Sequence, residues 1–499
     1  MSQWRPLKGD FLDEMLWHEV LGDDHGGPRC AYCEAPYIPA HDTTRLFKCY
    51  DCGQFLQCDD CCLLHHERTP QHVIEEWSGQ FWVSCMLAQI GLVYQLGHSG
   101  FPCPFPDSTV RKLVVMEAPI IHEIRVSYCK CAKSDNADNL QQLLRNAWYP
   151  VMVTDPGTCA TFRSMESYRL YNVLGNMNVR DYCWKYKLDP HERYKQFQRM
   201  ARQWAFLKHL KRAGRGHDPL GVNSTALGEC TVQCWACPQE ERNLPDGWED
   251  SFKDARFLYM LILAVDANFR LKNRIRTNEI DDPSLGPGWG YWVEPTKYKR
   301  HLKNIYKRER GTISTCIAFA ALLQKDTRLT TGLRVSGVGG CVCARHECMC
   351  PNGLGDGRPA EGRKVRLQYA NMDFIVMSAL AGFSLLWLTI SYDIACQWKL
   401  HIVERVPKLP QELCLPLDKI KVQYALPVWH AGSHNEDCQD ENSLSLKVGV
   451  GKTDGEGVER TWSVLNPAAF STKDSGCGVH TDSLEGKIDN HNYLKNVGQ

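Results

Sequence analysis

Three Cys-x2-Cys pairs between residues 30 and 61 constrain this chain most, because paired cysteines at that spacing are typical ligands of structural zinc. The pairs are Cys30 with Cys33, Cys49 with Cys52 and Cys58 with Cys61, followed by His65, His66 and His72. Two tetrahedral zinc ions need eight ligands, and the three pairs supply them together with His72 and either His65 or His66. The sequence therefore predicts a module in residues 28–135 that binds two zinc ions, after an N-terminal tail at 1–27.

The order of the pairs predicts which of them share an ion. The gap between the second and third pairs is short, which favours an interleaved arrangement. In it, the first and third pairs hold one ion, and the second pair and the histidines hold the other. This spacing resembles the cross-braced ZZ and B-box fingers, small modules that fold around their metal and usually bind a partner. A small core of reduced thiols is the alternative interpretation of the same residues.

Further cysteines and histidines follow in weaker patterns. A second metal group is expected from His98, Cys103, Cys129 and Cys131, or from Cys129 and Cys131 with Cys234 and Cys237. The string CVCARHECMC, residues 341–350, is metal-like in composition, but it lies in the half of the chain with the candidate catalytic residues. We therefore favour buried roles, or roles beside the catalytic residues, over a zinc site for its cysteines. His430, His434 and Cys438 recur every four residues, which fits one helical face. For that face a metal site, a DNA contact and a half-buried polar surface all remain open.

Composition excludes several classes of protein. The 499 residues include 25 cysteines, and Lys+Arg and Asp+Glu are both 58. Zero net charge argues against a polybasic tail or an acidic disordered chain, so nucleic acid has to be met by local basic faces. The first residues, MSQWRPLKGD, contain no signal peptide, and cysteines without secretion indicate metal sites or buried thiols rather than disulfides. We therefore expect an intracellular protein of about three domains.

One apolar run tests this expectation of a soluble protein. Residues 374–392, FIVMSALAGFSLLWLTISY, carry no charge and approach membrane-spanning length. Gly382 interrupts the run, and no second such run exists. We predict a buried helix, a break near Gly382 and a buried strand, with no membrane partner. Upstream, residues 136–250 are predicted to form a mostly helical, basic region.

Carboxylates follow two of the predicted buried strands. Asp266 ends the apolar run FLYMLILAV, and Asp393 ends LLWLTISY. Acids at such positions emerge at the rim of a parallel sheet, where α/β active sites form. Glu456 and Glu459 share a face of a helix expected after the glycines at 449–457. Three converging carboxylates can hold two Mg²⁺ ions for phosphoryl displacement. The spacing alone equally allows each Asp to cap the following element.

Two basic segments carry interleaved aromatic residues, at 193–215 and at 297–310. Such faces neutralise phosphates and give salt-dependent, largely sequence-independent affinity, although a solvated helix face has the same pattern. The basic side chains expected to contact DNA are Arg199, Arg202, Lys208, Lys211, Arg212, Lys299, Arg300, Lys307 and Arg308.

An ordered set of strings resembles one known family. From about residue 28 to about residue 495 the chain carries the cysteine cluster, then GLVYQLGHSGFPC, VSYCKC, LLRNAWYP, RMARQWAFLKHLKRAGRGHDP, CWACP, DANFRL, GVGGCVCARHE, YANMDF, SYDIACQW and DGEGVERTWSVLNP. No single string is decisive, but together and in this order they are similar to KDZ (Kyakuja–Dileera–Zisupton) transposases with an N-terminal CxC2-like cysteine cluster.

The resemblance implies an RNase H-like, retroviral-integrase-like catalytic domain with a DDE triad, at residues 251–470. The overall fold class is then mixed, α+β or α/β. Asp266 becomes the first acid and Asp393 the second, and the third is Glu459 in preference to Glu456. Arg460 and Trp462 look like the family's ER-x-W signature. The acids would bind Mg²⁺ or Mn²⁺ while water, and then a 3′-hydroxyl, attacks phosphodiesters at the ends of a mobile element.

The chain departs from the family pattern in two places. It ends soon after the acidic motif, which makes residues 471–499 a truncated tail, and ECMCPNGLGDGRPAEGRKVRLQY replaces a more regular stretch. Both departures make a catalytically dead, zinc-bearing derivative an alternative to an active transposase. A zinc-finger interaction or ubiquitin-pathway protein is a third class. The expected location is the nucleus, the expected partners are DNA and a chromatin or protein ligand of the zinc module, and an oligomer is compatible with the sequence.

Overall fold

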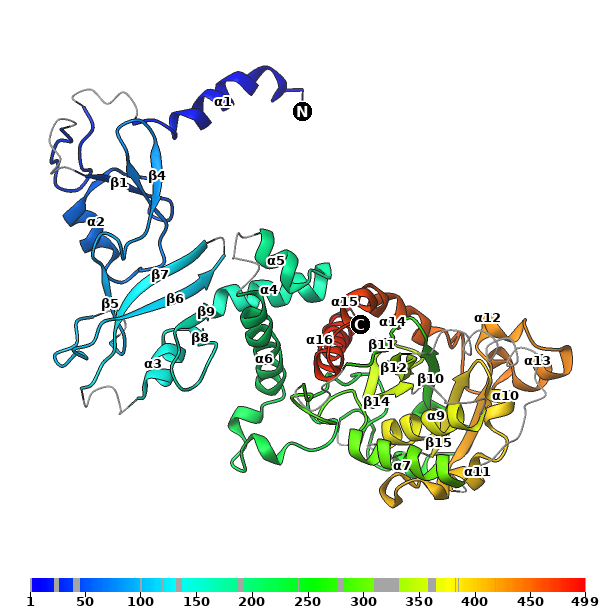
Figure 1. Cartoon of the computed structure of the whole chain (residues 1–499). Helices are drawn as coiled ribbons and strands as arrows, with labels where there is room; N and C mark the ends of the chain where they lie inside the picture. The colour runs from blue at the N-terminus through cyan, green and yellow to red at the C-terminus, as the bar shows by residue number, and fades with distance from the viewer. Residues whose placement is uncertain are drawn as a thin grey trace. The chain divides into compact units, whose positions relative to one another are not determined.

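The structure is a computed structural model in which the chain divides into two compact units. It describes residues 2–21, 27–38, 45–98, 101–118, 120–131, 137–185, 193–240, 242–276, 282–308, 332–357, 365–381, 383–384, 386–417 and 419–498. Unit 1 comprises residues 1–172 and 177–201, and unit 2 comprises residues 173–176 and 202–499. Figure 1 shows the elements of each unit.

Unit 1 contains a small antiparallel sheet in its cysteine-rich part. Its strands are β1 (Leu46–Cys49), β2 (Gln57–Cys58), β3 (Ile74–Trp77) and β4 (Trp82–Cys85), in the order β2-β1-β3-β4. Helix α2 (Asp59–His66) follows β2 directly, and α1 (Lys8–Trp17) precedes the sheet. The core is small, with Phe47, Ile74 and Leu87 packed beside cysteines. A core of this size favours a fold that depends on bound metal.

A second sheet completes unit 1. Its strands are β5 (Val93–Gln95), β6 (Arg111–Glu117), β7 (Ile120–Ser127), β8 (Trp148–Pro150) and β9 (Thr158–Thr161), in the order β5-β7-β6-β9-β8. The accompanying helices are α3 (Asn139–Arg145), α4 (Phe162–Gly175), α5 (Val179–Lys185) and α6 (Tyr194–Arg212), which crosses into unit 2. Asp138 and Gln141 form a capping box that begins α3.

The prediction of a mostly helical region at 136–250 is right for α3–α6 and wrong elsewhere. Strands β8 and β9 interrupt it, and the described residues after α6 form only short 3₁₀ turns, such as Arg215–His217 and Trp248–Asp250. Strand β9 pairs with β6, and β8 pairs with β9, so both strands join the sheet through a long-range contact that local periodicity does not reveal.

Unit 2 is built on a five-stranded mixed sheet. Its strands are β10 (Leu261–Asn268), β13 (Gly337–Cys343), β14 (Met349–Gly357), β15 (Trp387–Tyr392) and β16 (Lys421–Ala425). The order is β14-β13-β10-β15-β16. Strand β13 is antiparallel to both β14 and β10, whereas β15 is parallel to both β10 and β16. A two-stranded sheet pairs β11 (Asn273–Arg274) with β12 (Leu333–Val335).

The two faces of this sheet are covered by different helices. Alternate residues of β10 point to opposite faces. Leu261, Leu263 and Val265 pack in one core with helix α9 (Val365–Leu380), on which α7 (Pro295–Arg308) lies. Ile262 and Ala264 pack in the other core with α14 (Gly457–Leu465) and α16 (Cys477–Val497). Asp266, two residues after Ala264, therefore lies on the α14 face.

The apolar run at 374–392 folds as the sequence predicts. Its first part belongs to α9 and its last part is the fully buried strand β15, while Gly382 lies outside the described residues. No helix in the described part of the chain is long and apolar enough to cross a membrane. The segment expected as a tail differs, because α15 (Ala469–Lys473) and α16 pack against the sheet, with Leu484 and Ile488 in the core.

Candidate functional site: a carboxylate cluster and cysteine–histidine groups

The register between β10 and β15 brings two of the predicted acids side by side. Val265 pairs with Tyr392 in this parallel ladder. The next residues along the two strands are Asp266 and Asp393. Asp266 does not end its strand as expected, since β10 continues to Asn268 and pairs there with β13. Asp393 does follow the last residue of β15. The two acids therefore reach the same edge from neighbouring strands.

Helix α14 is docked over these acids by two glycines that permit close approach. A Cβ on Gly340 would lie 2.4 Å from the Trp462 ring, and Gly340 pairs with Asp266 across the ladder. A Cβ on Gly455 would lie 2.3 Å from Ser391 Oγ in β15. Trp462 Nε1 then donates a 2.9 Å hydrogen bond to Asp266 Oδ2. Small residues at these two positions let α14 lie on β10 and β13 and let the segment just before α14 approach β15 closely.

The two candidate third acids have different surroundings. Glu459 is exposed on α14, and its charge acts on both Asp266 and Asp393. Glu456 is the buried N-cap residue of α14, accepts a hydrogen bond from the backbone of Trp429 and lies 3.3 Å from His430 Nδ1. The structure therefore gives Glu456 a local partner, while Glu459 is exposed and acts on the other two acids through its charge.

The electrostatics of this cluster favour protons on the acids when no cation is bound. Burial, together with the charges of Asp393 and Glu459, raises the pKa of Asp266 well above its ordinary value. Burial raises the pKa of Asp393 to about 6, with Glu459 and Glu456 acting in the same direction and His430 opposing them. The hydrogen bond to Glu456 raises the pKa of His430 to about 9. Neighbouring carboxylates that resist losing protons are a suitable donor set for divalent cations, which supply the missing positive charge.

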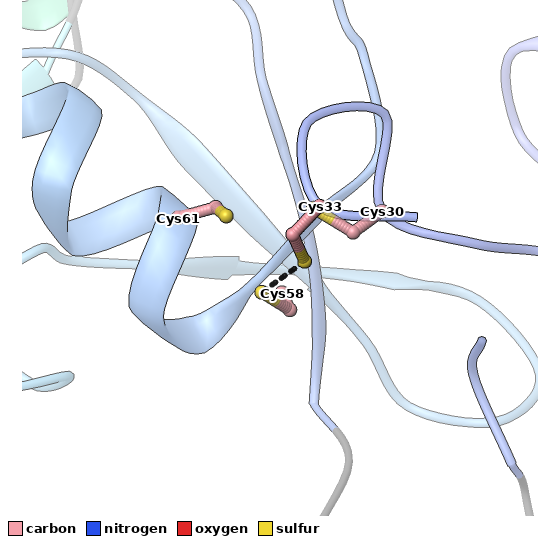
Figure 2. A group of neighbouring side chains, drawn as sticks. All are labelled: Cys30, Cys33, Cys58 and Cys61. Carbon is pink, nitrogen blue, oxygen red and sulfur yellow. Dashed lines mark hydrogen bonds between the residues drawn. The ribbon is translucent and has the colours of Figure 1, made fainter. Parts of the chain in front are cut away.

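Two four-residue groups in unit 1 collect the cysteine pairs in the interleaved pattern. Cys30, Cys33, Cys58 and Cys61 have their sulfur atoms within 4.8 Å of one another, and Cys33 and Cys58 are 3.6 Å apart (Figure 2). The second group is Cys49, Cys52, His66 and His72, again within 4.8 Å. The sequence left His65 and His66 open, and the structure selects His66. His65 instead lies against the Tyr32 ring, with centroids 3.8 Å apart.

A third group in unit 1 matches the first of the two predicted alternatives. His98 Nε2 lies 3.1 Å from Cys129 Sγ and 3.2 Å from Cys131 Sγ, and Cys103 completes the set. The other alternative, Cys129 and Cys131 with the CWACP pair, is wrong. Three or four thiolate and imidazole donors at such separations suit a tetrahedral Zn²⁺ ion.

Unit 2 contains two groups that sequence reasoning did not assemble. Cys234 and Cys237 join Cys343 and His346 in one group that could hold a metal ion. Cys343 is buried, as expected for the 341–350 string, but it also lies among these possible ligands. The Cys343-x2-His346 spacing is itself typical of two metal ligands, but nothing in the sequence joins it to the distant pair of Cys234 and Cys237. Among the remaining cysteines of that string, Cys341, Cys348 and Cys350 are buried, as expected.

The second group of unit 2 revises the predicted histidine face. Cys396, which follows β15, joins His434 and Cys438, while His430 turns to Glu456 instead. The sequence does not identify Cys396 as a ligand, because no other cysteine or histidine lies at Cys-x2-Cys or Cys-x2-His spacing from it. Only the fold brings it to His434 and Cys438.

The basic residues divide into paired and exposed ones. Arg202 forms ion pairs with Asp282 and Asp482, and Arg212 pairs with Asp489, all within unit 2. Carboxylates of unit 2 neutralise the charges of both arginines, which corrects the expectation that Arg202 and Arg212 contact DNA. Lys208 lies over the Trp204 ring. Arg199, Lys211, Lys299 and Arg300 are exposed, and the side chains of Lys307 and Arg308 lie outside the described residues.

The fold and these sites define a class of protein: a mixed α/β unit with a half-buried carboxylate cluster, joined to a unit rich in cysteine and histidine groups that could hold metal ions. The family model of the Kyakuja-Dileera-Zisupton transposase matches residues 259–492, which span the sheet of unit 2. The model described as a CxC2-like cysteine cluster associated with KDZ transposases matches residues 87–189. The chain belongs to the KDZ transposase family. No curated protein and no solved structure matches it significantly.

The cysteine-cluster match places that cluster further along the chain than the sequence suggested. It begins at residue 87, after the three Cys-x2-Cys pairs, and contains the group of His98, Cys103, Cys129 and Cys131. The two groups formed by the pairs therefore lie upstream of the matched region.

Proposed function

We propose that this chain cuts and joins DNA, and that Asp266, Asp393 and Glu459 bind two Mg²⁺ or Mn²⁺ ions for that reaction. One observation carries the proposal. The parallel register sets Asp266 beside Asp393, and α14 brings Glu459 close enough to raise the pKa of both. Acids shared in this way are the donor set of a two-cation phosphoryl-transfer site.

The arrangement of strands supports an RNase H-like fold for unit 2. Counted from β10, the strands lie in the order 3-2-1-4-5, with the first three antiparallel and the last two parallel to the first. The first acid is on the central strand and the second follows the adjacent parallel strand. This is the placement expected for a DDE triad, and membership of a transposase family supports DNA as the substrate.

The chain's own residues have distinct tasks in such a reaction. Bound cations would activate the attacking oxygen and stabilise the leaving oxygen during in-line displacement. Trp462 orients the Asp266 carboxylate through its hydrogen bond. His430 holds Glu456 at the start of α14, which leaves Glu459 free to meet the ions. The exposed Lys299 and Arg300 of α7 are candidates for phosphate contacts, and DNA as substrate would place the protein in the nucleus.

The test compares cleavage of DNA carrying the terminal repeats of the mobile element. Wild-type protein, Asp393→Asn and the matched control Asp437→Asn, an exposed acid on helix α13 (Glu436–Asn442), are assayed with and without Mg²⁺. We expect Mg²⁺-dependent nicking by wild type and the control, and background levels from Asp393→Asn. Equal cleavage by Asp393→Asn and wild type would remove the catalytic assignment.

A zinc-bearing protein that binds DNA or protein without cleaving is the second candidate. The three cysteine–histidine groups of unit 1 favour it, since such modules usually recognise partners. It predicts zinc-dependent binding with no nicking by wild type under any divalent cation. The cleavage assay therefore separates the two candidates.

A further inference from the structure

Four side chains of unit 2 have the geometry of a closed zinc site. His346 Nδ1 lies 3.4 Å from Cys234 Sγ and 3.3 Å from Cys343 Sγ, and all four donor atoms of the group lie within 4.8 Å of one another. A tetrahedral ion with ordinary Zn–S and Zn–N bonds separates such atoms by about 3.5 Å. The three cysteines, Cys234, Cys237 and Cys343, are buried. The donors are therefore spaced for one ion and shielded from competing water.

The group joins two segments that are distant in sequence. Cys234 and Cys237 lie in the loop before β10, whereas Cys343 ends β13 and His346 lies in the turn to β14. That turn is closed by a hydrogen bond from the Cys343 backbone to Cys348, 2.8 Å long. Glu347, directly after His346, has φ of 60°, a left-handed conformation unfavourable for a residue with a side chain. An ion held at both ends of residues 343–346 would offset the cost of this conformation.

Helix α14 packs against the same turn. Glu347 forms an ion pair with Arg460, and its carbonyl accepts a 3.3 Å hydrogen bond from Thr461 Oγ1. A Cβ on Gly457 would lie 3.1 Å from the Glu347 side chain. Gly457, Arg460 and Thr461 are spaced at i, i+3 and i+4, so one whole face of α14 rests on this turn.

Helix α16 holds the turn from its own side. Lys495 forms an ion pair with Glu347, and His491 Nε2 lies 2.9 Å from the Glu347 carbonyl oxygen. Asn492 exchanges hydrogen bonds with the backbone of Met349. The turn is thus a junction of the hairpin, α14 and α16.

We propose that Cys234, Cys237, Cys343 and His346 bind one Zn²⁺ ion, and that this ion positions α14 and with it Glu459. The zinc site stands on its own geometry, while the consequence for Glu459 rests on the proposed function. Without the ion, the turn would lose its cross-link to the 234–237 loop, and the face of α14 that rests on Glu347 would lose its fixed support.

The first measurement is the zinc content of the full-length protein after dialysis against a mild chelator, by elemental mass spectrometry. Cys237→Ala should lose one zinc per chain relative to wild type. Cys230→Ala, a buried cysteine of the same segment outside the group, should lose none. His346→Cys keeps four ligands and should also retain the ion. Zinc content in Cys237→Ala equal to that of wild type would overturn the site.

The second measurement is Mn²⁺ binding, followed by electron paramagnetic resonance. Cys237→Ala should bind Mn²⁺ about tenfold more weakly than wild type, the effect typical of lost outer-shell support, while Cys230→Ala and His346→Cys should match wild type. Glu347→Ala should keep the zinc ion, because Glu347 is not one of the four ligands. It should still bind Mn²⁺ weakly, because α14 loses its contact with the turn. This result would show that the weaker Mn²⁺ binding comes from a displaced α14 and not from loss of folding.

Two results contradict the positioning role in different ways. Zinc loss with unchanged Mn²⁺ affinity would show that the ion does not position Glu459. A wild type that holds this zinc but binds no Mn²⁺ would refute the proposed function, and with it the role given to Glu459, and leave the zinc site standing.

Discussion

Trp462 donates a hydrogen bond from Nε1 to Oδ2 of Asp266 across 2.9 Å, linking helix α14 to the central strand of the sheet. The contact is possible because Gly340, the partner of Asp266 on β13, leaves space for the indole ring. The residue that orients the first acid is therefore three positions from Glu459 on the same helix. A movement of α14 would displace both.

Replacing Trp462 with Phe should raise the pH needed for cation binding. The indole hydrogen bond favours the charged form of Asp266, so its loss raises the pKa of that carboxyl further. The midpoint of Mn²⁺ binding against pH should shift upwards relative to wild type. Trp292→Phe is the control, since Trp292 is buried in the same core and donates to the Thr481 backbone instead. Equal midpoints in the two variants would contradict the orienting role.

Asp393→Asn should stabilise the cation-free protein at neutral pH. The pKa of Asp393 is raised from 3.8 to about 6, so the folded state holds a proton that the unfolded state releases. The contribution of this proton to the free energy of unfolding is therefore fully present below pH 4 and is lost as the pH rises through about 6. The neutral amide avoids this loss, which amounts to about 3 kcal/mol at pH 7. Calorimetry without divalent cations should show the variant melting above wild type at pH 7 and with it at pH 4. A difference that does not vary with pH would count against the shift.

His66 and His65 form a matched pair for the second zinc group. His66→Ala should remove one zinc per chain and destabilise unit 1, because it leaves Cys49, Cys52 and His72 with one ligand missing. His65→Ala should keep the ion, since that ring packs at a tilt against Tyr32 and lies outside the group. Zinc analysis and thermal unfolding of the two variants provide the check. Zinc loss from His65→Ala alone would show that the ligand choice is wrong.

DNA binding should depend on salt through the exposed face of α7. Replacing both Lys299 and Arg300 with Gln should reduce the slope of log K against log salt by about 2, close to one for each phosphate contact. Lys297→Gln is the control, because the ammonium of Lys297 pairs with Glu412 at 2.6 Å. Fluorescence anisotropy over a salt series measures the slopes. A double variant with the wild-type slope would exclude this face as a DNA contact.

Much of the fold and site follows from local pattern. The spacing of the three Cys-x2-Cys pairs predicts which pairs share an ion, because each tetrahedral zinc ion needs four ligands and the second and third pairs lie close together in the sequence. The uncharged run at 374–392 predicts the helix and the strand that are observed as α9 and β15, while the expected break at Gly382 lies outside the described residues. The choice of Glu459 over Glu456 follows from the family pattern, and the structure adds a separate reason, the contact of Glu456 with His430.

The remainder depends on contacts between distant segments. Cys396 has no neighbouring ligand in the sequence, and only the fold brings it to His434 and Cys438. Cys343 and His346 meet Cys234 and Cys237 across more than a hundred residues, so spacing gave no reason to join them. Arg202 and Arg212 appear as part of a basic face in sequence, yet both find carboxylates on elements much later in the chain.

The central claim is that Asp266, Asp393 and Glu459 share divalent cations. A crystal structure of the full chain grown with Mn²⁺, with anomalous scattering recorded at the manganese edge, tests it most directly. We expect anomalous peaks between these three carboxylates that vanish in Asp393→Asn. Manganese sites elsewhere in the protein, with none between these acids, would contradict the account.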